Sequence, residues 1–195
     1  QFVFNTLFYG QLQEHGVQAK LTIRDKNEEV GLRFGMEANM EPDGLRFTVL
    51  EDENTILGYQ KFSVNKNNHI FINKSNRLSA NMQLRSANGK GLGLYTNDNN
   101  EDALQDITLS LANINLQEIL SAIPYAPDIR GTLNGDYHYI QEEKTFTLST
   151  FSAVNSLNYS GHDIGNVSTE IAYMPVEGGG HHVDGVVFMD DSEVI

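Results

Sequence analysis

The residues whose types could support chemistry form three short clusters. The first, Gly89-Lys90-Gly91-Leu92-Gly93, resembles a phosphate-binding loop only in its glycines. A phosphate loop ends in Gly-Lys-Ser/Thr and opens a helix, because the helix N-terminus holds the anion. Both features are missing from this stretch, so we expect a hairpin turn that leads into a strand.

The second cluster is acidic and spans residues 98–102. Asp98, Asn100 and Asp102 alternate as calcium ligands do. An EF-hand loop also needs Gly at its sixth position and Glu at its twelfth, where this chain has Ala103 and Leu109. An EF-hand is therefore excluded, and we expect an acidic, solvated turn.

The third cluster is the pair His181-His182, next to Asp184 and preceded by Glu177 and three glycines. Adjacent residues of an extended chain point to opposite faces, so the two imidazoles cannot easily converge on one ion. We expect a flexible hairpin loop here, with no metal site.

A search for a nucleophile with its base also predicts no enzyme. The chain has no cysteine and no Gly-x-Ser-x-Gly motif. Its acids cluster in turns, as Glu142-Glu143 and Asp190-Asp191 do. The other histidines have no neighbours that suggest catalysis, and we expect no cofactor; these histidines are His15, His69, His138 and His162.

The charge of the chain excludes one class of partner. The 195 residues carry 13 basic and 26 acidic side chains, a net charge of −13, and beyond Arg130 one base stands against ten acids. A nucleic-acid-binding protein needs a basic face, because counterion release supplies its affinity. We therefore expect no nucleic acid, and no attraction to an anionic bilayer through charge.

The elements that carry these clusters show period-two alternation of apolar and polar residues. Such spacing places one set of side chains on one face of a strand. Asn- and Gly-rich turns separate the strands, which predicts an all-β fold of many short-to-medium, mostly antiparallel strands. The alternating sets are Leu45, Phe47, Val49; Leu78, Ala80, Met82, Leu84; Ile107, Leu109, Leu111; Phe146, Leu148; and Val167, Thr169, Ile171, Tyr173.

Residues 129–139 allow two interpretations. Asn134-Gly135 resembles a two-residue hairpin turn. A continuous strand instead keeps nearly every large apolar residue in phase, and its glycines would allow a sharp bend or the close approach of another backbone. We therefore predict one strand with the inward set Ile129, Gly131, Leu133, Gly135, Tyr137 and Tyr139.

One short helix is predicted over residues 115–123. Asn115-Leu-Gln-Glu118 has the form of a capping box. Apolar residues follow at helical spacing, and Pro124 ends the helix, because the residue before proline avoids the α region.

The chain starts within a strand-like run and stops abruptly, so we expect a single β-rich segment (1–195) of a longer protein. Cut strand edges of such a segment would promote edge-to-edge self-association.

Several segments taken in order resemble the TamB/AsmA-like family, the inner-membrane component of a translocation and assembly module. Residues 114–124 followed by 129–135 are similar to its short helix and Gly-x-Leu-x-Gly strand. Residues 157–168, 171–173 and 182–186 resemble the strands that follow. The resemblance covers residues 77–190, whereas residues 1–76 match only as generic strands.

The resemblance implies a periplasmic location in a Gram-negative bacterium, as part of a chain anchored in the inner membrane. It implies strands curled into a one-sided apolar trough, a half-open roll like a taco. It also implies an outer-membrane assembly partner of the TamA type, and roles in inter-membrane phospholipid transport and outer-membrane protein assembly. A trough would bind acyl chains without a catalytic group, since each buried CH₂ contributes about 0.8 kcal/mol.

The residues expected to line the lipid groove share the apolar phase of their strands, although alternation alone does not separate a groove from an ordinary core. Two alternatives stay open: a β-sandwich module that binds a glycan or a protein, and part of an outer-membrane barrel. The groove residues are Ile107, Leu109, Leu111, Leu133, Tyr137, Tyr139, Phe146, Leu148, Leu157, Tyr159, Val167, Ile171 and Tyr173.

Overall fold

The computed structural model describes residues 5–51, 54–100, 102–120, 126–176, 178–190 and 192–193. Nearly all of them lie in antiparallel β-strands, with one short helix, which confirms the predicted all-β class. The chain divides into two compact units: unit 1 comprises residues 1–89 and 94–96, and unit 2 comprises residues 90–93 and 97–195. Strand β9 (Gly91–Thr96) contributes residues to both.

Unit 1 is an antiparallel sheet in the order β1-β2-β3-β4-β7-β8. Strand β5 pairs with β3 and β6, and β6 pairs with β8. The strands are β1 (Asn5–Leu12), β2 (Gly16–Arg24), β3 (Val30–Glu41), β4 (Gly44–Val49), β5 (Thr55–Leu57), β6 (Gln60–Val64), β7 (His69–Asn73) and β8 (Leu78–Ser86).

The core of unit 1 lies on β4 and β8, where Val49, Ala80, Met82 and Leu84 are buried. Asn68 is buried beside Val49, and its side-chain amide pairs with the Val49 backbone as a neighbouring strand would. Its Oδ1 accepts a hydrogen bond from the Val49 amide at 2.7 Å, and its Nδ2 donates to the Val49 carbonyl at 3.0 Å. The side chain thereby satisfies backbone groups that would otherwise be buried without partners.

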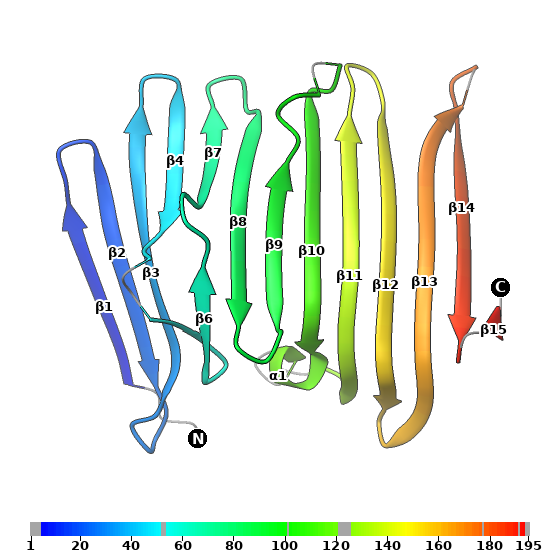
Figure 1. The fold of residues 1–195 in the computed structure, drawn as a ribbon, viewed down its shortest axis with the longest axis horizontal. Helices are drawn as coiled ribbons and strands as arrows, with labels where there is room; N and C mark the ends of the chain where they lie inside the picture. Colours follow the sequence, from blue (N-terminus) through cyan, green and yellow to red (C-terminus); the bar gives the residue numbers. More distant parts are fainter. Residues whose placement is uncertain are drawn as a thin grey trace. The chain divides into compact units, whose positions relative to one another are not determined.

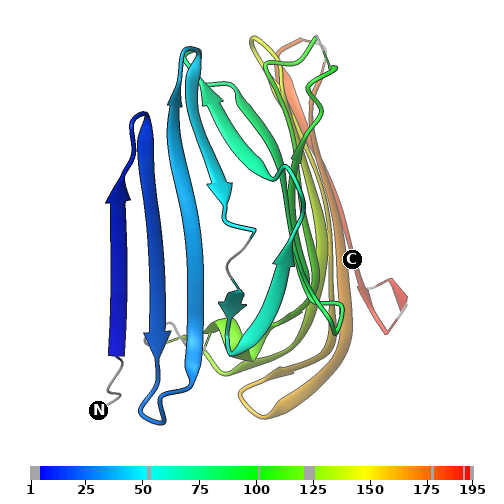
Figure 2. The same ribbon diagram turned by 60° about the vertical axis from the view of Figure 1, so that its left-hand side comes forward.

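Unit 2 is an antiparallel sheet whose strands lie side by side in chain order (Figure 1). Seen from the side, they form a single layer (Figure 2). The strands are β10 (Gln105–Asn115), β11 (Ile129–Gln141), β12 (Phe146–Tyr159), β13 (His162–Val176), β14 (Gly180–Met189) and β15 (Ser192–Glu193).

Strand β11 confirms the continuous-strand interpretation of residues 129–139. Gly131 adopts φ 143°, and a Cβ there would lie 2.7 Å from Cγ1 of Val154 on the next strand. Gly135 is buried beneath the ring of Tyr137. Both glycines therefore allow a neighbouring group to approach closely.

The helix α1 (Leu116–Leu120) is shorter than predicted within the described residues, and residues 121–123 of the expected helix lie outside them. Asn115 caps it as predicted, since its Oδ1 accepts a hydrogen bond from the Glu118 amide at 3.2 Å. The Glu118 carboxylate also lies 2.7 Å from Nζ of Lys90. The helix packs against β11.

Two β-bulges in unit 2 have the same kind of hydrogen-bond partner. In β10 and in β12 an extra residue interrupts the register with the neighbouring strand, next to Asn113 and Ser156, both at φ 52°. The Asn113 amide donates to Oδ1 of Asn134, and the Ser156 amide donates to Oδ1 of Asn166. An asparagine on the following strand thus satisfies the amide that each bulge removes from the ladder.

Candidate functional site: the two faces of unit 2

The register of unit 2 brings the predicted groove residues onto one face of the sheet, called the apolar face here. Ile107, Leu109 and Leu111 lie opposite Tyr139, Tyr137 and Gly135, and these pairings continue into β12, β13 and β14. Directly opposed residues of neighbouring strands share a face, so the apolar phase is continuous across the five strands β10–β14.

The bulge in β12 is required for this arrangement. Leu157 and Tyr159 are out of phase with Val154, so simple alternation would place them on the other face. The extra residue restores the phase, because Val154 pairs with Val167 and Leu157 pairs with Gly165.

Large side chains of the apolar face form two walls that run across the strands. At one end four rings follow one another. Tyr139 lies tilted against Phe146 at 5.7 Å, Phe146 stacks on Tyr173 at 4.7 Å, and Tyr173 stacks on His181 at 5.3 Å, each between ring centroids. At the other end an aliphatic wall is formed by Leu133, Val154, Val167 and Met189. The walls are about six residues apart along a strand, which corresponds to about 20 Å.

Small and large residues together form the floor between the walls. Gly135, Ser152 and Thr169 lie opposite one another on β11, β12 and β13. The Tyr137 hydroxyl lies 2.9 Å from Oγ of Ser152, which holds the Tyr137 ring down over Gly135. The next row along the strands contains Tyr137, Thr150 and Ile171, so large apolar side chains also lie between the walls.

Most groove residues are only half-buried, and none belongs to the buried core of the described residues. Ile171, Phe146 and Tyr159 are exposed, Ile171 to 44%. Ala103 is the only described residue with a buried apolar side chain in unit 2. The apolar face thus lacks the packed second layer that fills the interior of a sandwich.

The opposite side of the sheet, called the polar face here, carries a buried carboxylate that the sequence analysis missed. The side chain of Asp106 on β10 is only 5% exposed, although we expected the acids to cluster in turns. Its Oδ1 lies 2.7 Å from Nε2 of His138, and its Oδ2 accepts hydrogen bonds from Nδ2 of Asn100 at 2.8 Å and of Asn97 at 3.3 Å. No local motif identifies this group, because His138 is 32 residues away in the sequence.

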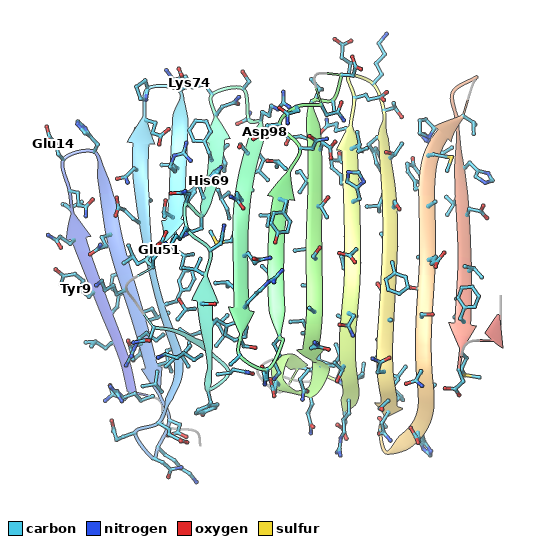
Figure 3. All side chains as sticks on the ribbon, viewed as in Figure 1. Tyr9, Glu14, Glu51, His69, Lys74 and Asp98 are labelled. Carbon is cyan, nitrogen blue, oxygen red and sulfur yellow. The ribbon has the colours of Figure 1, made fainter. Side chains whose placement is uncertain are left out.

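Burial alone would raise the pKa of Asp106. The hydrogen bonds from Asn100, His138 and Asn97 and the charge of His138 outweigh burial, so the pKa is lowered from its ordinary value. The carboxylate joins the residue 97–104 loop to the sheet. Asp98 of the acidic cluster lies in that loop (Figure 3), and Glu101 is outside the described residues.

The expectation of a flexible hairpin loop at the histidine pair was wrong, because His181 and His182 lie in strand β14 and pair with Pro175 and Met174. The two side chains separate as the alternation predicts. His181 stacks on Tyr173 on the apolar face, whereas Nε2 of His182 lies 3.8 Å from a carboxylate oxygen of Asp184 on the polar face. Within the described part of the chain, no three His, Cys, Asp or Glu side chains are grouped to hold a metal ion. The sequence analysis missed His181 as a member of the aromatic wall. If the pairing of β13 with β14 is continued from Tyr173 toward the glycine turn, His181 falls opposite Pro175 and on the same face as Tyr173.

Residues 89–93, the glycine cluster, form a turn and the start of β9. None of the described helices is long and apolar enough to cross a membrane. Comparisons with models of known families, with curated proteins and with solved structures find no match.

Proposed function

We propose that unit 2 binds phospholipid acyl chains on its apolar face and belongs to a periplasmic protein of the TamB/AsmA-like type. In this proposal the chain contributes to lipid transport between the inner and outer membranes, to outer-membrane protein assembly with a partner of the TamA type, or to both. The parent chain is anchored in the inner membrane, and no step requires catalysis.

The observation that carries the proposal is an apolar face that continues over five strands and stays half-exposed. A sheet normally covers such a face, because each Å² of apolar surface removed from water contributes about 25 cal/mol. Acyl chains are a chemically suitable cover, since they have no polar groups that need partners.

The apolar face suits a mobile ligand. The aromatic wall and the aliphatic wall border a floor of small and apolar side chains that runs across the strands. Contacts to hydrocarbon are non-directional, so a chain can slide along the floor at little cost. The Tyr137 and Ser152 hydroxyls of the floor already satisfy each other and need nothing from the ligand.

A non-enzymatic role is consistent with the environment of Asp106 and His138. The Asp106 carboxylate is bound by three side chains of its own unit, and it holds a loop in place. Such saturation is typical of a structural carboxylate.

Native mass spectrometry of the chain purified from a bacterial envelope, followed by lipid extraction, tests the proposal. We expect phospholipid to co-purify with the wild type, and Ile171→Asp to lower its occupancy at least about fivefold, because burying a carboxylate against hydrocarbon is costly.

Met174→Asp is the matched control. Met174 lies on the same strand with nearly the same exposure, 42% against 44% for Ile171, but on the polar face. It should retain the lipid. A folded wild type without lipid, or equal loss in both variants, would contradict acyl-chain binding on the apolar face and leave a scaffolding role in assembly.

A further inference from the structure

The polar face of unit 2 carries more acidic than basic side chains. Asp136, Glu170 and Asp184 project from β11, β13 and β14, in register with the face of His138 and His182. Among the described residues of β10–β14 on this face, the one Lys or Arg is Arg130, at the start of β11. Around Asp136, Glu170 and Asp184 the face is therefore acidic.

This imbalance extends over the whole unit. Unit 1 contains ten basic and ten acidic residues, whereas unit 2 contains three basic and sixteen acidic residues, so the net charge of −13 belongs to unit 2. Lys90 pairs with Glu118 near the helix, and Arg130 pairs with Asp128 at the start of β11. Lys144 lies in the β11–β12 turn. The three bases of unit 2 thus lie away from Asp136, Glu170 and Asp184.

An aromatic ring lies at the centre of these carboxylates. Phe151 on β12 is directly opposite Asp136 on one side and Glu170 on the other, and its side chain is 39% exposed. The three residues line a shallow hollow of about 530 Å³, together with Ser149, Ala172 and Asp184. An exposed ring flanked by carboxylates favours a guanidinium or ammonium group, which can stack on the ring and pair with the acids.

The spacing argues for side chains of a protein rather than for a single metal ion. Asp136 and Glu170 lie on strands that are two apart, so their backbones are about 10 Å from each other. Within the described residues, no three His, Cys, Asp or Glu side chains are grouped to hold a metal ion. Several cationic side chains of one extended segment can occupy both carboxylates at once.

We propose that the polar face of unit 2 is a docking surface for a protein segment rich in arginine and lysine. An arginine of that segment stacks on Phe151 between Asp136 and Glu170, and a second cation pairs with Asp184. Charge complementarity speeds the encounter, and the ring makes the contact selective for arginine.

Binding of a fluorescent oligoarginine peptide to the 195-residue chain tests this proposal by anisotropy. We expect Asp136→Asn combined with Glu170→Gln to weaken binding about tenfold or more at low salt, and Phe151→Leu to weaken it about threefold. The Phe151→Leu effect should be smaller for oligolysine, because arginine stacks better on a ring.

Glu142→Gln combined with Glu143→Gln is the matched control. It removes the same formal charge from the β11–β12 turn, and we expect less than a twofold change. Equal weakening in both double variants would show attraction to net charge alone and overturn the proposal. Release of the peptide by calcium at constant ionic strength, in proportion to one bound ion, would also overturn it and indicate a cation site. Circular dichroism checks folding, and Asp184→Asn gives an independent readout if the double variant unfolds.

Discussion

At the scale of single residues, Asp106 is both buried and ionisable. Its hydrogen bonds to Asn97, Asn100 and His138 favour the charged form, and its pKa is lowered. A carboxylate with a lowered pKa stabilises the folded state above its ordinary pKa, and this stabilisation disappears as the pH falls through the folded-state pKa. Asp106 therefore makes the stability of unit 2 sensitive to acid.

Asp106→Asn should remove that sensitivity. We expect the variant to be less stable than the wild type at about pH 7, and the difference to narrow as the pH falls below the ordinary aspartate pKa of about 4 toward the lowered folded-state pKa. Urea unfolding monitored at a series of pH values measures this. Asp163→Asn, at an exposed position of the same unit, serves as the control. A difference that stays constant with pH would contradict the role of the carboxylate.

At the scale of elements, the predictable part of the fold is the phase of each strand. Leu45 to Val49, Leu78 to Leu84 and Ile107 to Leu111 each alternate, and each set lies in a strand, β4, β8 and β10. Alternation is visible locally because it depends only on neighbouring positions. The bulges at Asn113 and Ser156 were not predicted, since a single left-handed residue leaves little trace in the sequence.

Contacts between residues far apart in the sequence could not be predicted either. The capping of α1 by Asn115 depends on residues three apart and was predicted. The contact of Asp106 with His138 depends on the register of β10 with β11, which in turn depends on the bulge. The groove residues could be assigned to one phase, but their half-exposure could not, because alternation does not say what covers a face.

Two glycines on the apolar face should respond differently to added side chains. A Cβ at Gly135 would lie 3.0 Å from the Phe151 carbonyl oxygen and 2.8 Å from the Tyr137 hydroxyl oxygen, whereas at Gly185 the nearest atom is 3.7 Å away. We expect Gly135→Ala to lower the free energy of unfolding by about 1–3 kcal/mol. Gly185→Ala should change it by less than about 0.5 kcal/mol or raise it slightly. Chemical denaturation of both variants compares them, and equal effects would show that the approach of the Phe151 backbone is not limiting.

At the scale of the whole molecule, charge distinguishes the two units more than architecture does. Both are antiparallel sheets, yet unit 1 is formally neutral and unit 2 carries the entire net charge of −13. Like charges held together in a folded unit repel one another, and salt screens that repulsion.

Salt should therefore stabilise the units unequally. Raising the ionic strength from about 0.01 M to about 0.3 M should slow amide hydrogen exchange in β11–β14 more than in β2–β4. Exchange followed by mass spectrometry at peptide resolution measures both units in one sample. The same slowing in both units would mean that self-repulsion within unit 2 is too weak to matter.

The paired bulges have a consequence for how such a protein can change in length. Each bulge and the asparagine that satisfies its amide belong to one pair of neighbouring strands, β10 with β11 and β12 with β13. The β12 bulge also shifts the register of β12 with β11. A lineage of such proteins could therefore lengthen or shorten by two strands at a time, provided that the new neighbouring strand accommodates this shift.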